Sequence, residues 1–353
     1  MFPTKFNHCI SALKAKNYSN PTELISVLGS KSINFSEIQP IIFADIIYTR
    51  SQDKSYNNID VANALNSFVK KWTNVIAHKV DEFDKKELVD SIWALGHISA
   101  QPDSEFIFEW ILRAGGLLNS FTARDLTVSL LALSKINSDD LIPTVTDWAT
   151  LEQKYITLEN KYSESTESII MGHGILNITI IDEFLYHWHI SAIKTINDCS
   201  AKDLSQNIYA LKTLNFKPSY EFIEVWQNKA VNDITNFNSQ ALANSIYAFA
   251  KLEIKPKNDF LNAWQNKAQE DITNFNSQEL ANSIYAFAKL EIKPNDDFLN
   301  AWQNKAVNDI TNFNSQNLAN SIYAFKKLDI SLPNFLIETN HDDYDVSIIG
   351  DVQ

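Results

Sequence analysis

Four side chains that could bind a ligand recur at fixed spacing in the second half of the chain. The first full set is Gln240, Asn244, Tyr247 and Lys251. At 100° per residue these positions fall within about 60° of one another, so a helix would present them as one stripe. Amides can read base edges, an aromatic ring can stack on a base and a lysine can neutralise a phosphate. The stripe is therefore a candidate surface for single-stranded RNA.

Similar sets lie at intervals of 38 residues on either side of this one. The candidate RNA-binding residues are Gln240, Asn244, Tyr247, Lys251, Gln278, Asn282, Tyr285, Lys289, Gln316, Asn320, Tyr323, Lys327, Lys202, Gln206 and Tyr209. Earlier units vary the set as Lys86, Asp90, Trp93 and His97, or as Arg124, Val128, Leu131 and Lys135. Three alternatives stay open: the Asn side chains can instead bond a neighbouring unit, the Tyr side chains can belong partly to the core, and amide-plus-aromatic sets also suit protein interfaces.

The stripe belongs to a long-range repeat. Residues 237–274 recur as residues 275–312 with five changes, and a third copy begins at Phe313. Seven tryptophans continue the period at intervals of 38 or 40 residues, at Trp72, Trp110, Trp148, Trp188, Trp226, Trp264 and Trp302. A leucine series has the same period but lacks a member near position 166, which predicts one degenerate unit there. A fixed period of this size is typical of a stacked array of helical units.

Each regular unit is expected to contain two helices. The first begins with a polar cap followed three residues later by an acid, as in Asn276 with Glu279, which predicts a capping box. The same pattern recurs as Asp84 with Glu87, Thr122 with Asp125, and Ser200 with Asp203. The second helix carries the tryptophan, which is expected to anchor the core between neighbouring units.

The chain divides by the quality of the repeat. We expect an N-terminal capping segment over 1–33 with a short helix from Pro21 to Leu28, degenerate repeats over 34–198, regular repeats over 199–330 and an acidic flexible tail over 331–353. A weak unit over 164–176 contains Gly172 and Gly174, each costing about 1 kcal/mol of helix stability, and is a candidate bend.

Charge is unevenly distributed. The net charge of −13 divides into −7 over 1–198, −1 over 199–330 and −5 over 331–353. This is not the strongly basic balance of general nucleic-acid binders, and the acidity would also attract basic protein partners. Two series of lysines also recur with the period. They could bind a row of phosphates or could simply be exposed to solvent. The series are Lys229, Lys267 and Lys305 in the second helices, and Lys217, Lys255 and Lys293 in the loops.

Catalytic signatures are not recognisable. His187 and His189 are two residues apart, whereas a helical metal pair is separated by four, and the glycine pairs lack the context of a phosphate loop. Cys199 falls at a repeat position otherwise held by phenylalanine, so it is expected to be a small buried side chain. We expect a non-enzymatic protein with no cofactor, metal or small-molecule substrate.

No signal peptide or membrane span is evident, which favours a cytoplasmic protein or one secreted into a host cell without a cleavable signal peptide.

The period and the recurring sequence FNSQ-x-LANSIYAFAKL, followed by a proline and an aromatic-rich second helix, resemble the octotricopeptide repeat family of organellar RNA-binding proteins. Related arrays occur in intracellular bacteria. The resemblance is strongest over 199–330 and weaker over 36–198. It implies an α-solenoid and sequence-selective binding of single-stranded RNA. From the repeat itself we expect an all-α solenoid of about eight helix-turn-helix repeats, with one nucleotide bound per unit along the stripe. The alternative function is a protein–protein interaction scaffold, such as a bacterial effector acting on host proteins.

Overall fold

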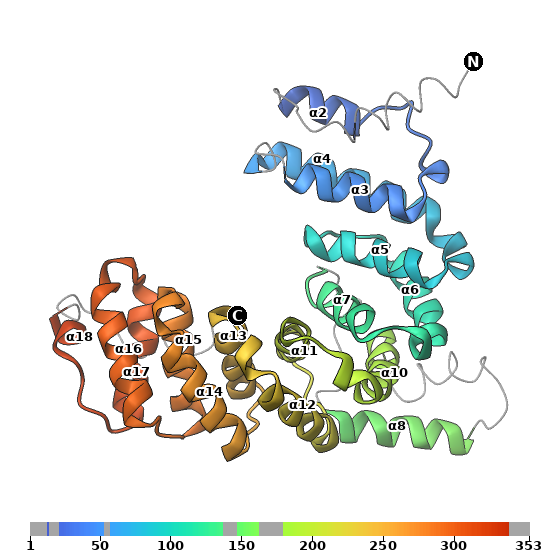
Figure 1. Cartoon of the computed structure of the whole chain (residues 1–353). Helices are drawn as coiled ribbons and strands as arrows, with labels where there is room; N and C mark the ends of the chain where they lie inside the picture. The colour runs from blue at the N-terminus through green and yellow to red at the C-terminus, as the bar shows by residue number, and fades with distance from the viewer. Residues whose placement is uncertain (1–12, 14–20, 53–56, 137–146, 162–178, 339–353) are drawn as a thin grey trace. The chain divides into compact units, whose positions relative to one another are not determined.

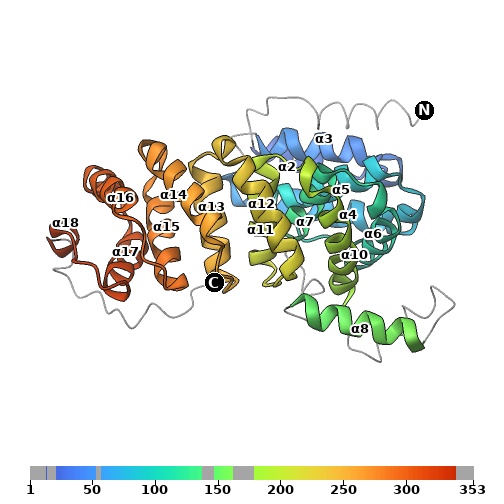
Figure 2. The ribbon, with the colours of Figure 1, turned by 60° about the horizontal axis from the view of Figure 1, so that its bottom comes forward.

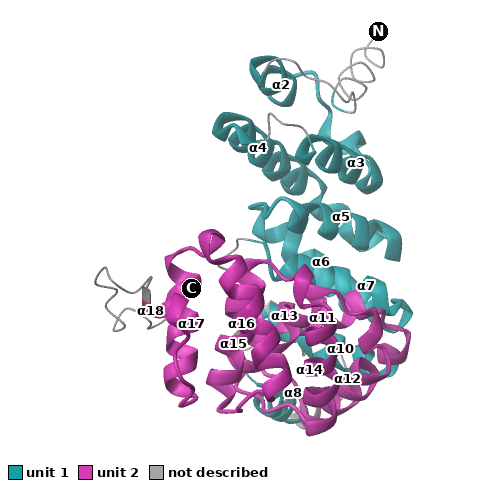
Figure 3. Ribbon diagram, turned by 60° about the vertical axis from the view of Figure 1, so that its left-hand side comes forward, with its two compact units in different colours: residues 1–194 teal, residues 195–353 magenta. Residues whose placement is uncertain are grey.

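The structure is a computed structural model, which describes residue 13 and residues 21–52, 57–136, 147–161 and 179–338. These described residues form helices joined by short connections, with no β-strand among them. The chain separates into two compact units, residues 1–194 and 195–353 (Figure 3).

Unit 1 contains successive antiparallel helices, and the short helix that the sequence predicts from Pro21 to Leu28 is present (Figure 1). The α-helices are α2 (Pro21–Leu28), α3 (Pro40–Ser51), α4 (Ile59–Ile76), α5 (Lys85–His97), α6 (Ser104–Leu117), α7 (Ala123–Leu133), α8 (Trp148–Lys161) and α10 (Ile180–Thr195). The 3₁₀ helices are η1 (Phe35–Glu37), η3 (Ala77–Glu82) and η4 (Leu118–Ser120). Helices α3, α5 and α7 pack side by side in one row, and α2, α4 and α6 form the other.

Unit 2 repeats this two-row arrangement with greater regularity. Its α-helices are α11 (Ala201–Thr213), α12 (Tyr220–Asn232), α13 (Ser239–Lys251), α14 (Asn258–Glu270), α15 (Ser277–Leu290), α16 (Asp296–Asn308), α17 (Ser315–Lys327) and α18 (Asn334–Glu338). The connecting turns are η6 (Ile196–Asp198), η7 (Ile234–Asn236), η8 (Ile272–Asn274) and η9 (Ile310–Asn312). In Figure 2 α13, α15 and α17 lie alongside one another, with α14 and α16 in the second row. The predicted all-α solenoid is confirmed.

The repeated tryptophan joins the two helices of each pair. Its indole N–H donates to the carbonyl of the leucine that is the fourth residue of the first helix, as from Trp264 to Leu242 over 2.9 Å. The same bond joins Trp110 to Leu88, Trp226 to Leu204 and Trp302 to Leu280. All four indoles are fully buried. Truncation of one such side chain to alanine is expected to cost about 3–5 kcal/mol of folding free energy.

The prediction that Trp148 anchors the core between neighbouring units is wrong. Trp188 of α10 donates to the carbonyl of Leu126 in α7 over 3.0 Å, so α7 and α10 are the paired helices. Trp148 is only half-buried and stacks on His189 of α10, with ring centroids 3.8 Å apart. The residues between α7 and α10 are thus an insertion into one unit. The weak unit predicted over 164–176 lies outside the described residues.

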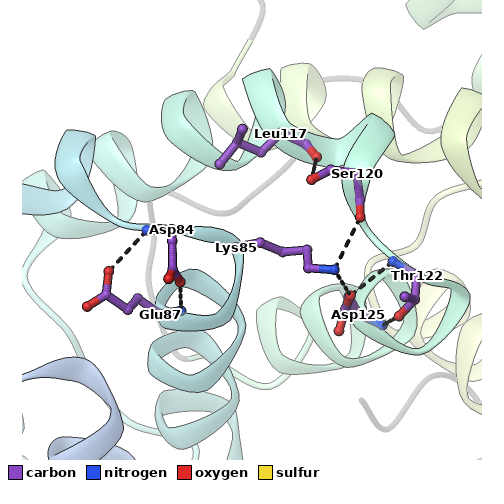
Figure 4. Close-up of polar contacts among 7 residues, drawn as sticks. All are labelled: Asp84, Lys85, Glu87, Leu117, Ser120, Thr122 and Asp125. Carbon is purple, nitrogen blue, oxygen red and sulfur yellow. Dashed lines mark hydrogen bonds and ion pairs between the residues drawn. The ribbon is translucent and has the colours of Figure 1, made fainter.

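The predicted capping boxes are confirmed at Asp84 with Glu87, Thr122 with Asp125, Ser200 with Asp203 and Asn276 with Glu279. Figure 4 shows a further role for the second of these. Lys85, the first residue of α5, donates to the Ser120 carbonyl over 3.3 Å and lies 3.5 Å from the Asp125 carboxylate. The same acid therefore caps α7 and binds the preceding helix of its row.

The segment predicted as a tail begins with structure. Helix α18 occupies residues 334–338, and Leu336 is fully buried. Residues 339–353 lie outside the described part of the chain, so the predicted flexibility of the tail is not addressed there.

Candidate nucleic-acid interface

The candidate stripe lies on the first helices of unit 2, α11, α13, α15 and α17. Because these helices pack in sequence, the structure brings the repeated sets into adjacent rows. Gln240 and Lys251 at the two ends of the α13 set are exposed, whereas Asn244 and Tyr247 between them are half-buried. The other sets follow this pattern except at one tyrosine.

The asparagine amides are not used to hold the array together. Asn244, Asn282 and Asn320 are partly exposed and form no hydrogen bond with another residue in the part of the chain described. The alternative in which these amides bond a neighbouring unit is therefore not what the structure shows. Their donors and acceptors remain available to a ligand.

The tyrosines form a continuous column across three helices. Ring centroids are 6.2 Å apart between Tyr247 and Tyr285 and 5.6 Å apart between Tyr285 and Tyr323, each pair inclined by 41°. Tyr285, in the middle, is only 8% exposed. The rings contact one another, so a flat base could lie over the column but not between its members.

A lysine-rich groove of 1070 Å³ lies at the C-terminal ends of these helices. Its charged lining comprises Lys212, Lys251, Lys255, Lys289 and Lys327, opposed by Glu253 and Glu291. Lys327 is paired with Glu291 at 2.8 Å, whereas Lys251, Lys255 and Lys289 form no ion pair with any described residue. The groove is thus a cationic surface on a protein whose net charge is −13.

The pKa values of two lysines reflect these surroundings. Burial, together with the nearby charge of Lys251, lowers the pKa of Lys212, which lies 4.4 Å from the centre of the Tyr209 ring. The hydrogen bond and charge of Glu291 raise the pKa of Lys327. Repulsion between neighbouring lysines would be relieved by a bound anion, because an opposite charge favours the protonated form.

Sequence reasoning missed part of this groove. Lys212 precedes the lysine position of the stripe by one residue, where α13 and α15 carry Ala250 and Ala288 and only α17 also has a lysine, so the repeat gives a weak signal for it. Glu253 and Glu291 were also missed, because they lie beyond the helix ends. Lys255 does belong to the recurring loop series, and that recurrence was the available signal.

The second-helix lysines have a different role. Lys229, Lys267 and Lys305 each pair with the aspartate one turn later, at Asp233, Asp271 and Asp309, over 2.7–2.8 Å. Their side chains are only 16–20% exposed. Each pair lies at the C-terminal end of its helix. These lysines are therefore neither unpaired phosphate-binding groups nor fully exposed to solvent.

Other candidate chemistries find no support in the described residues. No group of three or more His, Cys, Asp or Glu side chains there could hold a metal ion. His189 is buried and Cys199 is 4% exposed, with burial raising the pKa of the Cys199 thiol to about 12, as expected of a small core side chain. Within the same described ranges, every helix is too short or too polar to cross a membrane.

Comparison with known proteins gives one partial match. A search of curated proteins found no significant relative. Residues 219–341, which contain helices α12 to α18, match the model of a family described as RESC6, RNA-editing substrate-binding complex 6 protein.

Proposed function

We propose that this protein is a non-catalytic binder of single-stranded RNA, and that the RNA lies along the first helices α11, α13, α15 and α17. The lysine-rich groove is the observation that carries the proposal. Gathering lysines that form no ion pair is unfavourable, because like charges repel, and a bound anion would offset that repulsion. A row of them beside a repeated aromatic-and-amide surface suits a nucleic-acid backbone whose bases face that surface.

The repeat supports an ordered mode of binding. Each of the α13, α15 and α17 sets offers two amides, one tyrosine and one lysine. One such set per unit suits helical repeats that read one base per unit. The phosphates would occupy the groove, while Asn244, Asn282 and Asn320 would contact base edges. The matched family model covers these units and is named for an RNA-editing substrate-binding complex, which supports RNA as the ligand.

The tyrosine geometry refines the mode of stacking. Because Tyr285 is nearly covered by its neighbours, Tyr247 and Tyr323 would contribute more to stacking than the central ring. Base–aromatic stacking is worth about 1–3 kcal/mol per base. We therefore expect Tyr247→Ala and Tyr323→Ala to weaken binding more than Tyr285→Ala, provided that each variant is folded.

The test is selection from a randomised single-stranded RNA pool, followed by affinity measurements between about 50 and 200 mM salt. Lys251→Ala with Lys289→Ala should weaken binding at least tenfold. It should also reduce the slope of log affinity against log salt by about 1.4, because each phosphate contact with a single strand contributes about 0.7. The matched control is Lys70→Ala with Lys71→Ala, which removes the same charge from exposed positions on α4.

The outcomes are distinct. An enriched motif whose binding depends on the groove lysines but not on the α4 lysines supports the proposal. Three equivalent stripes should also select three identical consecutive bases. The absence of enrichment at low salt, or equal losses in both double variants, would contradict RNA binding and leave the protein scaffold as the function to pursue.

A further inference from the structure

The first-helix row of unit 1 carries the same aromatic column as unit 2. Tyr48 of α3 and Trp93 of α5 have ring centroids 5.9 Å apart and are inclined by 43°. These values match the tyrosine contacts of unit 2, at 5.6–6.2 Å and 41°. His97, one turn beyond Trp93, stacks on its ring at 4.9 Å. The column is thus a common feature of both units.

The polar neighbours of the column differ in charge between the units. Three residues before the tyrosine, unit 2 has asparagine, as at Asn244 before Tyr247. Unit 1 has carboxylates at the corresponding places, Asp45 before Tyr48 and Asp90 before Trp93. At the position of Lys251 it has His97, whose pKa is lowered by burial and by Lys135. Around Tyr48 and Trp93, carboxylates therefore stand where unit 2 has amides.

These groups surround a pocket of 340 Å³ between α3 and α5. Its walls include Ile41, Asp45, Tyr48, Lys86, Asp90 and Trp93. Its charged lining comprises Asp45, Asp90 and Lys86, and Lys86 pairs with Asp90 at 2.5 Å. The volume is at the lower end of the range for ligand sites and suits one long side chain.

The apolar part of the pocket is unusually open. Tyr48 is 51% exposed and Ile41 is 45% exposed, which places both among the most exposed large apolar side chains that the structure describes. Exposed apolar surface bordered by charged groups commonly marks an interaction site. Here the surface is aromatic and its border is acidic, and both features favour a cation.

We propose that this pocket binds an arginine side chain from a basic polypeptide segment of a partner protein. The guanidinium would lie against the Tyr48 and Trp93 rings and donate to the carboxylates of Asp45 and Asp90. Arginine fits better than lysine because its planar group both stacks on aromatic rings and bonds carboxylates through two parallel N–H groups. The site belongs to unit 1, whereas the proposed RNA surface belongs to unit 2.

The test uses the full chain and a fluorescein-labelled glycine peptide that contains two arginines, measured by fluorescence anisotropy without RNA. Matched peptides replace arginine by lysine or by uncharged citrulline. Asp45→Asn with Asp90→Asn, and separately Trp93→Leu, should each weaken binding of the arginine peptide at least tenfold. The control for general acidity is Asp81→Asn with Glu82→Gln, two exposed positions on η3 of the same unit. Circular dichroism melting verifies that each variant is folded.

Binding that prefers arginine, requires Trp93 and tolerates the η3 substitutions supports the proposal. Equal binding of the lysine peptide, equal losses in the two acid-removing variants, or no effect of Trp93→Leu would overturn it, because these results indicate general attraction to an acidic protein. Because the assay contains no RNA, a negative result would not contradict the proposed RNA function. A negative result in the RNA selection would likewise not contradict the arginine site.

Discussion

At the scale of single residues, His189 is an ionisable ring held in an apolar site. It is 1% exposed and its ring stacks on Trp148 at 3.8 Å. Burial lowers the pKa of His189 to about 3 from its ordinary value of 6.5. Between these two values the unfolded chain binds a proton that the folded chain does not, so the free energy of unfolding falls as the pH falls below 6.5.

We therefore predict that His189→Phe makes unit 1 less sensitive to acid. Lowering the pH from 7 to 5 should cost the native chain about 2 kcal/mol through this residue, or roughly 4–8 °C in melting temperature for a unit of this size. The variant should lose this part of the shift while keeping an aromatic ring beside Trp148. Calorimetric melting at both pH values measures the difference, with the exposed His78→Gln on η3 as control. An unchanged shift in His189→Phe would contradict the assignment.

At the scale of helices, first helices in both units end in the same left-handed turn without glycine. Residues with φ of 49–56° follow these helices at Ser99, Asn215, Glu253, Glu291 and Asp329. The next residue closes the turn by a bond back to the last turn of the helix, as from the Ile254 N–H to the Phe249 carbonyl over 3.0 Å. A side chain in this conformation costs about 1–2 kcal/mol, and glycine avoids most of this cost.

Glu253→Gly is accordingly predicted to stabilise unit 2 by about 0.5–1 kcal/mol, after allowance for the greater freedom of glycine in the unfolded chain. Chemical denaturation should show a higher midpoint. Glu291→Gly should gain less, because it also removes the 2.8 Å pair with Lys327. A lower midpoint for Glu253→Gly would show that the glutamate makes a compensating contribution in the folded state.

These helix ends also mark what the sequence could and could not predict. Caps such as Asn276 with Glu279 were predictable because the bonding side chains lie within one helical turn. The left-handed ends carried no glycine to signal them. Trp148 was misassigned because spacing alone cannot tell which helix an indole will bond, and its neighbour Trp188 makes that bond to Leu126 across an insertion. The stripe was predictable because its residues lie on one face of a single helix. The groove was not, because side chains and turns from several helices form it.

At the scale of the whole molecule, successive units of the C-terminal array are interchangeable in structure. Residues 237–274 and 275–312 differ at five positions. Helix α15 meets α13 and α17 through the same tyrosine contact, inclined by 41° on both sides. Trp264 and Trp302 make the same 2.9 Å bond within their own units. In such arrays the stability is roughly a sum over units and their nearest-neighbour contacts.

Deletion of residues 275–312 should therefore leave a folded protein, because α13 would meet α17 through a surface equivalent to the one it now offers α15. The deletion removes one stripe, including Asn282 and Tyr285, and also removes Lys289 from the groove. If each unit contacts one nucleotide, the shortest RNA that binds with full affinity should become one nucleotide shorter, and the optimal RNA should bind more weakly. A length series of the selected RNA, measured with both proteins, tests this directly. A folded deletion variant with the same minimal length and affinity as the native chain would show that the stripes do not bind RNA one unit at a time.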